Sequence, residues 1–261
     1  YLSPLKTWET NLIGTLNLLE SLKNYQNKCS IIIITTDKVY KNKEWIYAYR
    51  ENDELGGHDP YSASKAATEI AVESWKQSFI GENFSQNNLL SIATARSGNV
   101  VGGGDWSKNR ILPDAVNSII NNKELIIRNP NSTRPWQHVL EPLGGYLLLA
   151  QKVYENPALY SGPFNFGPEL NSNKTVEELI NEVFKYWKGS YKKQYNLKDS
   201  PHEAKILNLD IQKSYKYLNW KPLWNFEFTI KKTIMWYKEF YSGKNPMSLC
   251  KEDLKNYLNF L

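Results

Sequence analysis

The chain has 261 residues, of which 41% are hydrophobic and 23% charged, so it can bury a sizeable core as one or two domains. Its formal net charge of +5 comes from lysines scattered along the chain without a basic block, which suits a small anionic ligand and gives no sign of nucleic-acid binding. The two cysteines, Cys29 and Cys250, lack metal-ligand or disulfide spacing, which suits a reducing cytoplasm, and no apolar run of about 18 residues predicts a membrane span.

The first predicted element is a helix over residues 3–23. Ser3 and Pro4 suit its cap and its first position. Apolar residues then recur at the helical period, at Leu5, Trp8, Leu12, Ile13, Leu16, Leu19 and Leu22. Asn11 lies within this helix, and its amide either packs as a structural polar group or binds backbone or water.

A buried strand is predicted over residues 30–35. Four consecutive isoleucines, Ile31 to Ile34, show no alternation, which favours a strand covered on both faces of a parallel sheet. The polar residues Thr36, Asp37 and Lys38 follow directly. They would therefore lie at the carboxyl end of the strand, where open α/β sheets bind their ligands.

A second helix is predicted over residues 60–80, with Asp59 as its N-cap. Tyr61 and Lys65 are four residues apart and share one helical face. A nearby ammonium group lowers the pKa of a tyrosine and makes the phenol a usable base for a hydroxyl proton. With 17 tyrosines in the chain, an ordinary surface pair is the alternative interpretation.

The remaining elements alternate between helix and strand, which predicts parallel pairing with right-handed crossovers. An aromatic-rich loop spans residues 40–58 and would suit a lid or a wall that stacks on a sugar. Further elements are predicted at 89–96 (strand), 113–121 (helix), 124–128 (strand), 141–154 (helix), 162–166 (strand-like), 175–187 (helix), 226–241 (helix) and 248–260 (helix).

Two later segments are candidate ligand-binding loops. The glycines of residues 96–106, R-S-G-N-V-V-G-G-G-D-W, do not form G-x-G-x-x-G or open into a helix, so they predict a permissive turn beside a ligand more than a phosphate loop. Arg134 lies next to Trp136, with His138 four residues further on. The arginine is either a diphosphate clamp or a surface residue stacked on the tryptophan.

Taken together, these motifs resemble the extended short-chain dehydrogenase/reductase family, and within it the CDP-glucose 4,6-dehydratases. The matching phrases are T-D-K-V-Y from Thr36, N-K-E-W from Asn42, L-G-G-H-D-P-Y-S-A-S-K-A-A from Leu55, R-S-G-N-V-V-G-G-G-D-W from Arg96, R-P-W-Q-H-V from Arg134 and V-L-E-P-L from Val139. The resemblance spans essentially the whole chain. It implies an α/β fold, the C-terminal part of a Rossmann-like doubly wound parallel sheet with a smaller mixed α/β substrate domain.

The resemblance also implies a reaction and a set of catalytic residues. CDP-glucose would become CDP-4-keto-6-deoxyglucose, with NAD taking hydride from C4 and returning it to C6. Tyr61 would take the C4 hydroxyl proton, Lys65 would hold the nicotinamide ribose, and Thr36 would hydrogen-bond the C4 oxygen. Asp37 would act as the acid for the departing C6 hydroxyl.

Lys38 departs from the pattern of related dTDP-sugar dehydratases, which carry Thr-Asp-Glu at this place with the glutamate as C5 base. A lysine is a base only if burial or neighbouring cations lower its pKa. The alternatives are that Lys38 is this base, or that it orders the site electrostatically while another group takes the C5 proton.

For binding, the resemblance places Ser97 near the nicotinamide. Asn99, Arg110, Arg134, His138 and His202 would surround the sugar nucleotide. Many relatives have an arginine near residues 201–203, where this chain reads Pro-His-Glu. That difference shifts phosphate binding onto Arg110 and Arg134.

The resemblance implies that an N-terminal part is missing. Residues 1–107 would be the rest of the NAD-binding domain, without its first strands and glycine-rich loop, and 108–261 mainly the sugar-nucleotide domain, with segments near 124–150 returning to the first. The strand at Ile31 to Ile34 would then lie at an exposed sheet edge. We expect such a fragment to bind NAD poorly alone and to be inactive.

Three functions follow as hypotheses: a nucleotide-sugar 4,6-dehydratase, a related epimerase or reductase that uses only Tyr61 and Lys65, and a non-catalytic remnant. Asp37 favours the first, because epimerases and reductases need no acid at C6. The resemblance further implies a cytoplasmic homodimer that pairs through helices 3–23 and 60–80, with no nucleic acid, membrane or metal as partner.

Overall fold

The computed structural model describes residues 3–80, 89–194 and 207–261. The chain divides into two compact units, which are described separately. Unit 1 consists of Tyr1–Gly98, Pro142–Gly167 and Leu207–Lys221. Unit 2 consists of Asn99–Glu141, Pro168–Ile206 and Pro222–Leu261. The first division between the units falls after Gly98.

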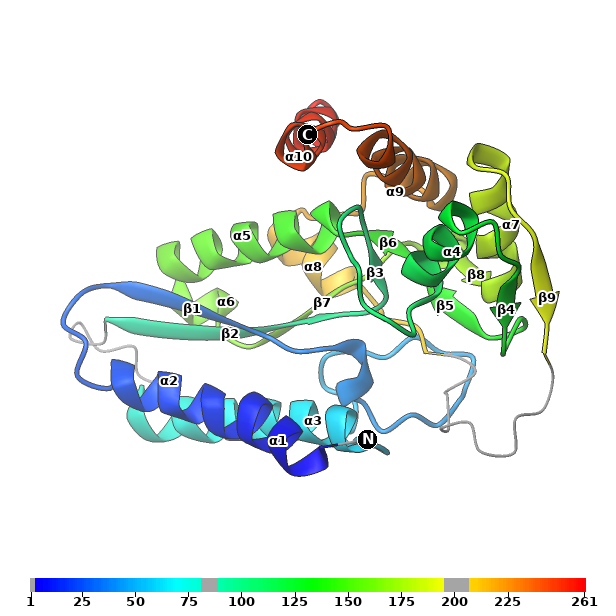
Figure 1. Ribbon diagram of the computed structural model, residues 1–261. Helices are drawn as coiled ribbons and strands as arrows, with labels where there is room; N and C mark the ends of the chain where they lie inside the picture. The colour runs from blue at the N-terminus through cyan, green and yellow to red at the C-terminus, as the bar shows by residue number, and fades with distance from the viewer. Residues whose placement is uncertain (1–2, 81–88, 195–206) are drawn as a thin grey trace. The chain divides into compact units, whose positions relative to one another are not determined.

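Unit 1 is built on a parallel sheet of three strands in the order β1-β2-β7 (Figure 1). The strands are β1 (Cys29–Ile34), β2 (Leu90–Ser97) and β7 (Pro163–Phe166). Ile34 is paired with Ala95 and Ser97 with Phe166, so the carboxyl ends of all three strands lie at one edge. The predicted parallel α/β sheet is confirmed.

Helices cover both faces of this sheet (Figure 1). On one face lie α3 (Pro60–Phe79) and a continuous helical segment of α1 (Pro4–Trp8), the π-helical η1 (Glu9–Ile13) and α2 (Gly14–Leu22). On the other lie α5 (Leu140–Glu155), which begins in unit 2, and α8 (Gln212–Leu218), with the short α6 (Pro157–Tyr160) beside them.

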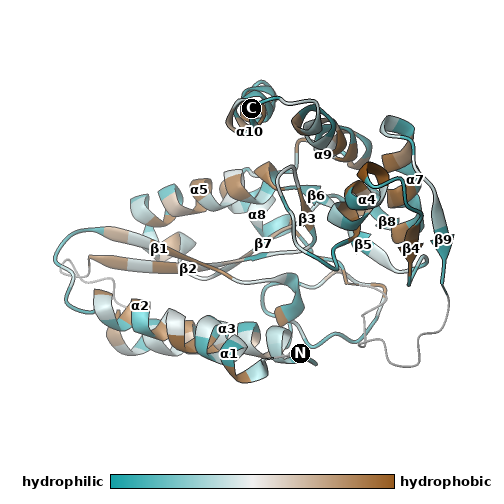
Figure 2. Ribbon diagram, in the orientation of Figure 1, coloured by the Kyte–Doolittle hydropathy of each residue, from teal (hydrophilic) through white to brown (hydrophobic). Residues whose placement is uncertain are grey.

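The isoleucines of β1 divide between these two layers. Ile31 and Ile33 pack with Leu19 and Trp75 on the side of α2 and α3, whereas Ile32 packs on the opposite side. Each fully buried aliphatic side chain contributes roughly 2 kcal/mol to folding, so this strand holds both layers together. Brown stretches along β1 and β2 in Figure 2 follow this pattern.

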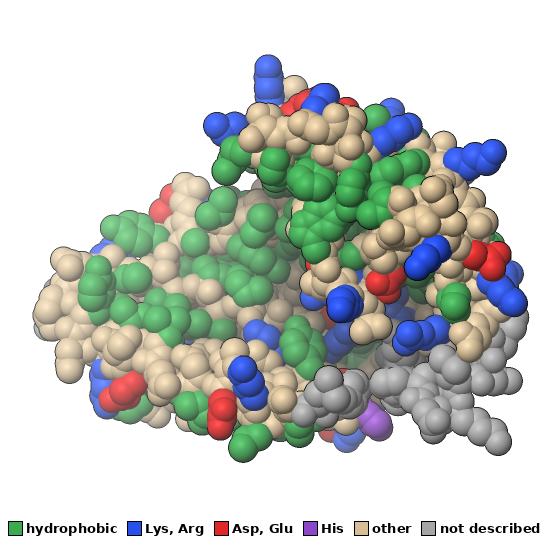
Figure 3. Space-filling model, in the orientation of Figure 1, with side chains coloured by type: hydrophobic (Ala, Val, Ile, Leu, Met, Phe, Trp, Pro, Cys, Tyr) green, Lys and Arg blue, Asp and Glu red, His purple; other side chains and the backbone are tan. Residues whose placement is uncertain are grey.

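Strand β1 lies at an edge of the described sheet, as we predicted. Its last isoleucine, Ile34, is 40% exposed, and on α5 Leu143 is 46% and Leu147 75% exposed. Hydrophobic side chains accordingly gather on this face of unit 1 in Figure 3. Such an edge with apolar neighbours is a place where another chain segment can pair.

The N-terminus of α3 is fixed by a capping box. The Asp59 carboxylate accepts the backbone N–H groups of Tyr61 and Ser62, at 2.9 and 3.1 Å, and the Ser62 hydroxyl accepts the N–H of Asp59 at 3.0 Å. The predicted cap is therefore confirmed. The cap stabilises the helix by roughly 1 kcal/mol and fixes the start of α3, so that Tyr61 lies in its first turn.

Unit 2 combines short two-stranded sheets with four longer helices. The paired strands are β3 (Val100–Val101) with β6 (Gln137–His138), β4 (Leu125–Ile127) with β9 (Tyr191–Lys193), and β5 (Thr133–Pro135) with β8 (Asn173–Thr175). The helices are α4 (Ile111–Ile120), α7 (Val176–Tyr186), α9 (Phe226–Tyr241) and α10 (Pro246–Leu258), with the 3-10 turn η3 (Leu170–Ser172). Their shared core includes Leu112, Ile180, Ile230 and Tyr237.

The glycines at 102–104 have a packing reason. A Cβ on Gly103 would lie 2.1 Å from the Trp236 ring of α9, and a Cβ on Gly102 would lie 2.8 Å from Val139. Gly104 adopts a φ of 86°, which side chains other than glycine rarely accept. These residues therefore let the turn after β3 lie directly against its neighbours in unit 2.

Candidate active site

The Thr36-Asp37-Lys38 triplet lies just past the end of β1. Thr36 caps the 3-10 turn η2 (Asp37–Val39), and its hydroxyl donates to Asp37 Oδ1 at 2.9 Å. Thr36 is 6% and Asp37 2% exposed, whereas the side chain of Lys38 is exposed. The triplet thus presents a buried carboxyl group held by a hydroxyl, with a lysine beside it.

Lys38 acts on the cap of α3. Burial by itself would raise the pKa of Asp59, but hydrogen bonds from Ser62 and Tyr61 and the charge of Lys38 lower it overall. The lysine therefore lies close enough to stabilise the carboxylate that caps the helix of Tyr61.

Tyr61 and Lys65 occupy the first turns of α3. The Tyr61 side chain is 41% exposed, and the Lys65 ammonium donates to the carbonyl of Ile34, the last residue of β1, at 3.0 Å. Burial lowers the pKa of Lys65, and the charge of Glu69 opposes that shift. The lysine is thereby held at the carboxyl end of the strand that leads into Thr36.

A second tyrosine, Tyr146 of α5, belongs to the same group and was missed from the sequence. Its hydroxyl hydrogen-bonds the Ser97 side chain at the end of β2, and its ring meets Phe166 edge-on at 5.4 Å. Burial raises the pKa of Tyr146 to about 12, and the charges of Asp37 and Tyr61 add to the rise. The sequence offered one signal for this residue: Tyr146 lies in the second turn of the predicted helix at 141–154.

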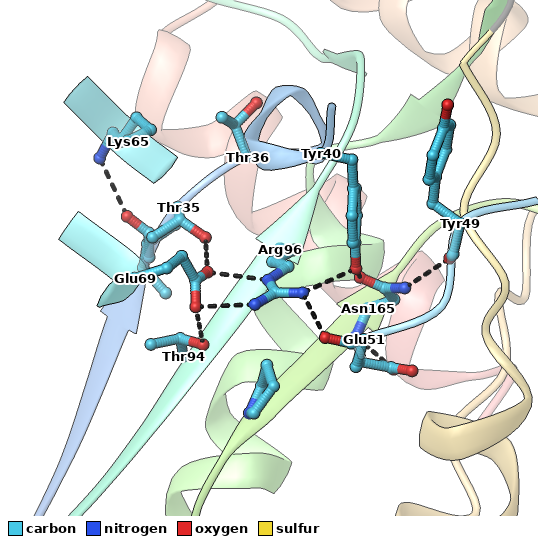
Figure 4. Close-up of polar contacts among 12 residues, drawn as sticks. Thr35, Thr36, Tyr40, Tyr49, Glu51, Lys65, Glu69, Thr94, Arg96 and Asn165 are labelled. Carbon is cyan, nitrogen blue, oxygen red and sulfur yellow. Dashed lines mark hydrogen bonds and ion pairs between the residues drawn. The ribbon is translucent and has the colours of Figure 1, made fainter. Parts of the chain in front are cut away.

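A buried charged pair lies beneath these residues (Figure 4). Arg96 Nε lies 2.9 Å from Glu69 Oε1 and Arg96 Nη2 lies 3.0 Å from Glu69 Oε2, with side chains 3% and 4% exposed. The hydroxyl groups of Thr35 and Thr94 also donate to Glu69. The network ties α3, one turn beyond Lys65, to the ends of β1 and β2.

The same network reaches the aromatic loop at 40–58. Arg96 donates to the Tyr40 hydroxyl at 2.9 Å, and Tyr40 donates to Asn165 Oδ1 at 2.7 Å (Figure 4). Tyr40 and Tyr49 stack at 5.1 Å and are each 2% exposed. These two rings are therefore core residues and cannot form a sugar-stacking wall, whereas Tyr47 is 65% exposed.

Three predicted substrate-binding residues lie in unit 2. Arg134 lies on β5, half-buried, and donates to the carbonyl of Thr133 at 2.9 Å. Arg110 precedes α4 and pairs with Asp105 at 3.0 Å, with its side chain 64% exposed. The carbonyl of Asn99 accepts the N–H of Gln137 at 3.2 Å.

His138 occupies the interior of unit 2, at 2% exposure. Its Nδ1 accepts the N–H of Leu140 at 3.3 Å, and its ring lies 4.7 Å from that of Trp224. Burial, together with the charge of Lys232, lowers its pKa to about 3, so the imidazole is neutral. This position favours a packing role over direct substrate contact; His202, also predicted to bind substrate, lies outside the described residues.

The residues predicted to bind NAD lie in unit 1, at or near the ends of neighbouring strands. Ser97 ends β2, Lys65 bonds the end of β1, and Tyr61 lies one turn before Lys65. A hydroxyl, an ammonium and a phenol fit the hydroxyl and amide groups at the nicotinamide end of NAD. The 261 residues contain no G-x-G-x-x-G sequence, so this chain offers no loop of that type for the pyrophosphate.

Comparison with known proteins identifies the family. The GDP-mannose 4,6 dehydratase family profile matches residues 1–233. The chain belongs to this family. A CDP-glucose 4,6-dehydratase from Salmonella typhimurium is 39% identical over 259 residues, which cover 99% of this chain and 72% of that protein. This relative agrees with the group of dehydratases that the motifs indicated.

Solved structures show the same fold at lower identity. The dTDP-glucose 4,6-dehydratase of Bacillus anthracis, in complex with NAD, aligns with a TM-score of 0.72 at 20% identity over 92% of this chain and 71% of that one. The UDP-glucuronic acid 4-epimerase of Bacillus cereus, in complex with UDP-glucuronic acid and NAD, aligns with a TM-score of 0.75 at 21% identity. The alignment covers 89% of this chain and 69% of that one. The Rossmann-like α/β fold of the extended short-chain dehydrogenase/reductases is thereby confirmed.

Within residues 3–80, 89–194 and 207–261, no helix is both long and apolar enough to cross a membrane. The same ranges contain no group of three or more His, Cys, Asp or Glu side chains that could hold a metal ion.

Proposed function

We propose that this protein catalyses the 4,6-dehydration of a nucleotide sugar, CDP-glucose to CDP-4-keto-6-deoxyglucose. The observation that carries the proposal is the buried Asp37 carboxyl beside Thr36, at the strand end where Lys65 of the Tyr61 helix is anchored. An acid and a base in one site suit a reaction that removes water after oxidation. The 39% identical CDP-glucose 4,6-dehydratase supports this nucleotide and sugar.

NAD is the cofactor we propose, and when bound it supplies the oxidation at C4 and the reduction at C6. Tyr61, Lys65 and Ser97 would hold its nicotinamide end. Lys65, anchored on Ile34, provides the positive charge that favours the Tyr61 phenolate. Tyr61 then accepts the proton of the C4 hydroxyl.

Asp37 supplies the proton for the departing C6 hydroxyl. Asp37 is 2% exposed and lies at the strand end beside the Tyr61 helix, and it must be protonated when water leaves. Thr36 orients this carboxyl group through the 2.9 Å hydrogen bond and offers its oxygen to the C4 group of the sugar. Lys38, which is exposed and whose charge helps to lower the pKa of Asp59, orders the site electrostatically in this proposal, so that another group takes the C5 proton.

The substrate diphosphate and sugar are assigned to unit 2. Arg110 and Arg134 carry the guanidinium groups that match phosphate oxygens, and Asn99 and His202 remain candidates for the sugar nucleotide. His138, buried against Trp224, would position β6 and Arg134 instead of contacting substrate. Unit 1 would accordingly bind NAD and unit 2 the sugar nucleotide.

We further propose a cytoplasmic homodimer. Cys29 and Cys250 are both free thiols, which suits a reducing compartment. The apolar side chains exposed on η1, α2 and α3 favour pairing between two copies through residues 3–23 and 60–80.

The proposal is tested by incubating the protein with NAD and CDP-glucose and assaying the alkali-absorbing 4-keto-6-deoxy product. Tyr61→Phe should reduce turnover by roughly 100-fold or more, because it removes the base. Tyr25→Phe, which alters an equally exposed phenol at 44%, should leave turnover unchanged. A parent protein that gives no product would refute the dehydratase assignment, and Tyr61→Phe turnover within threefold of the parent would refute the role of that phenol.

A nucleotide-sugar 4-epimerase is the alternative function for the same fold, since Tyr61 and Lys65 are the only catalytic residues that such a reaction would need from this site. Its product retains the C6 hydroxyl and does not absorb in alkali, so the same assay separates the two. The buried acid at Asp37 favours dehydration.

A further inference from the structure

The proposed substrate carries a pyrimidine base as well as two phosphates and a sugar. Arg110 and Arg134 are the partners proposed for the phosphates, whereas the base still needs one. A base is a flat ring that binds well by stacking on an aromatic side chain. An exposed aromatic ring next to a phosphate-binding arginine is therefore the partner that this part of the substrate requires.

Trp106, in the turn that follows β3, is such a ring. All nine tryptophans of the chain lie within the described residues, and Trp106, at 50%, is the only one of them that is exposed. Its ring packs against three aromatic rings of α9, with centroid distances of 5.2 Å to Tyr237, 5.2 Å to Phe240 and 5.9 Å to Tyr241. Hydrophobic side chains accordingly gather over α9 in Figure 3. The indole is thus supported by the core of unit 2 while half of its surface stays open.

The turn that carries Trp106 is held in one conformation. The Tyr237 hydroxyl donates to the carbonyl of Asp105 at 2.7 Å and accepts the N–H of the same residue at 3.0 Å. Two residues earlier, Gly103 lies so close to the Trp236 ring that no side chain would fit there. A ring that is fixed before the ligand arrives loses little conformational entropy on binding, which favours affinity.

The same turn carries positive charge beside the indole. The Asp105 carboxylate, adjacent to Trp106 in the chain, accepts a hydrogen bond from Arg110 Nη1 at 3.0 Å. The Arg110 side chain is 64% exposed, and a guanidinium has further N–H donors for a phosphate. Lys108, between them, is also exposed. An apolar protein surface that covered the indole would bury these charges, whereas a nucleotide brings phosphates that pair with them.

We propose that Trp106 is the stacking platform for the pyrimidine base of the substrate, with Arg110 at the diphosphate attached to it. The base lies on the open side of the indole, and Asp105 holds the arginine next to it. This subsite rests on the proposed function and deepens it, because it assigns a residue of unit 2 to the nucleoside. The platform would accept either pyrimidine, since every base has a flat face to stack.

The test measures binding of CDP and of inorganic pyrophosphate by calorimetry, which requires no turnover. In Trp106→Ala the Kd for CDP should rise at least about tenfold, because stacking is lost, while the Kd for pyrophosphate should stay within about twofold. Trp106→Phe keeps an aromatic ring and should bind CDP within about threefold of the parent. Arg110→Met should weaken both ligands, because each carries phosphates.

Tyr215→Ala is the matched control, since it removes an aromatic side chain of α8 that is 52% exposed and should change neither Kd. Circular dichroism and the pyrophosphate affinity report whether each variant is folded. Parental CDP affinity in Trp106→Ala, an equal loss of both ligands in it, or a parent that binds CDP no more tightly than pyrophosphate would overturn the subsite.

The subsite and the proposed function fail separately. A parent that forms no 4-keto-6-deoxy product, but loses CDP selectively in Trp106→Ala, would overturn the dehydration and support the base platform. A parent that forms this product, with CDP binding unchanged in Trp106→Ala, would overturn the platform alone.

Discussion

Lys38 differs from the two residues before it in its surroundings. Thr36 and Asp37 are buried, whereas Lys38 is exposed and its charge contributes to lowering the pKa of Asp59. Burial or neighbouring cations are what make a lysine a base near neutral pH, and Lys38 is exposed. Its position therefore favours the electrostatic alternative over the role of C5 base.

We predict that Lys38→Met retains proton exchange at C5. Incorporation of solvent deuterium at C5 should persist, and turnover should fall by no more than about tenfold, through weaker ordering of the α3 cap. The check is product isotope content by mass spectrometry, with the exposed Lys41→Met as control. A loss of about 1000-fold together with abolished C5 exchange would make Lys38 the base after all.

His138 gives the folded protein a distinct pH dependence. Its folded pKa of about 3 lies below the ordinary 6.5, so the folded state binds fewer protons than the unfolded state. The contribution of this residue to stability is complete above pH 6.5 and is lost as the pH falls through the window from 6.5 to 3.

The expected loss of unfolding free energy from His138 is about 2 kcal/mol between pH 7 and pH 5. Denaturant unfolding at both pH values should show this difference in the parent and a smaller one in His138→Gln. His58→Gln changes an exposed histidine and should keep the dependence of the parent. An identical pH dependence in His138→Gln and parent would mean that His138 is accessible to protons in the folded state.

At the scale of elements, the Glu69–Arg96 pair joins α3 to β1 and β2. Glu69 follows Lys65 by one helical turn. The Glu69–Arg96 pair, which ties α3 to the sheet, therefore also helps to hold Lys65 at its hydrogen bond with the carbonyl of Ile34. A buried charge left without its partner is costly, and this sets the expectation for mutating either side.

Glu69→Gln should lower the unfolding free energy by about 3–5 kcal/mol, because the Arg96 charge would remain buried without a carboxylate. The measurement is a denaturant titration at pH 7. Glu54→Gln is the control, since Glu54 is 51% exposed in its pair with Lys41 and should cost less than about 1 kcal/mol. A cost for Glu69→Gln as small as the control would show that water reaches this network.

At the scale of the whole molecule, the exposed apolar side chains of the N-terminal helices bear on self-association. Apolar side chains are exposed along η1, α2 and α3: Ile13 is 47%, Leu18 48%, Ile70 60% and Phe79 49% exposed. Exposed apolar side chains on packed helices suit burial against a second copy of the chain.

We expect the parent to sediment as a dimer and Ile70→Asp to sediment as a monomer with unchanged circular dichroism. The aspartate would place an unpaired charge in the interface. Leu159→Asp alters an apolar residue of α6 with 50% exposure and should remain dimeric. A monomeric parent, or a dimeric Ile70→Asp, would exclude pairing through these helices.

The local features of this chain were readable from the sequence. The long helices and the strands of unit 1 followed from periodicity, and the α3 cap followed from Asp59, because each depends on residues within a few positions. The Thr36-Asp37-Lys38 turn and the Tyr61–Lys65 pair were found in the same way, and their family resemblance agrees with the profile match.

Other features were decided by the tertiary structure alone. The strands β5, β8 and β9 are three residues long each, which is too short for a hydrophobic pattern to predict them. They form because another strand pairs with them in the fold. Tyr40 contacts Asn165 across more than 100 residues of chain, and Arg96 contacts Glu69 on another element. Burial, pairing and desolvation depend on what packs around a residue, so sequence determined the chemical groups of this protein, and only the fold decided which of them meet.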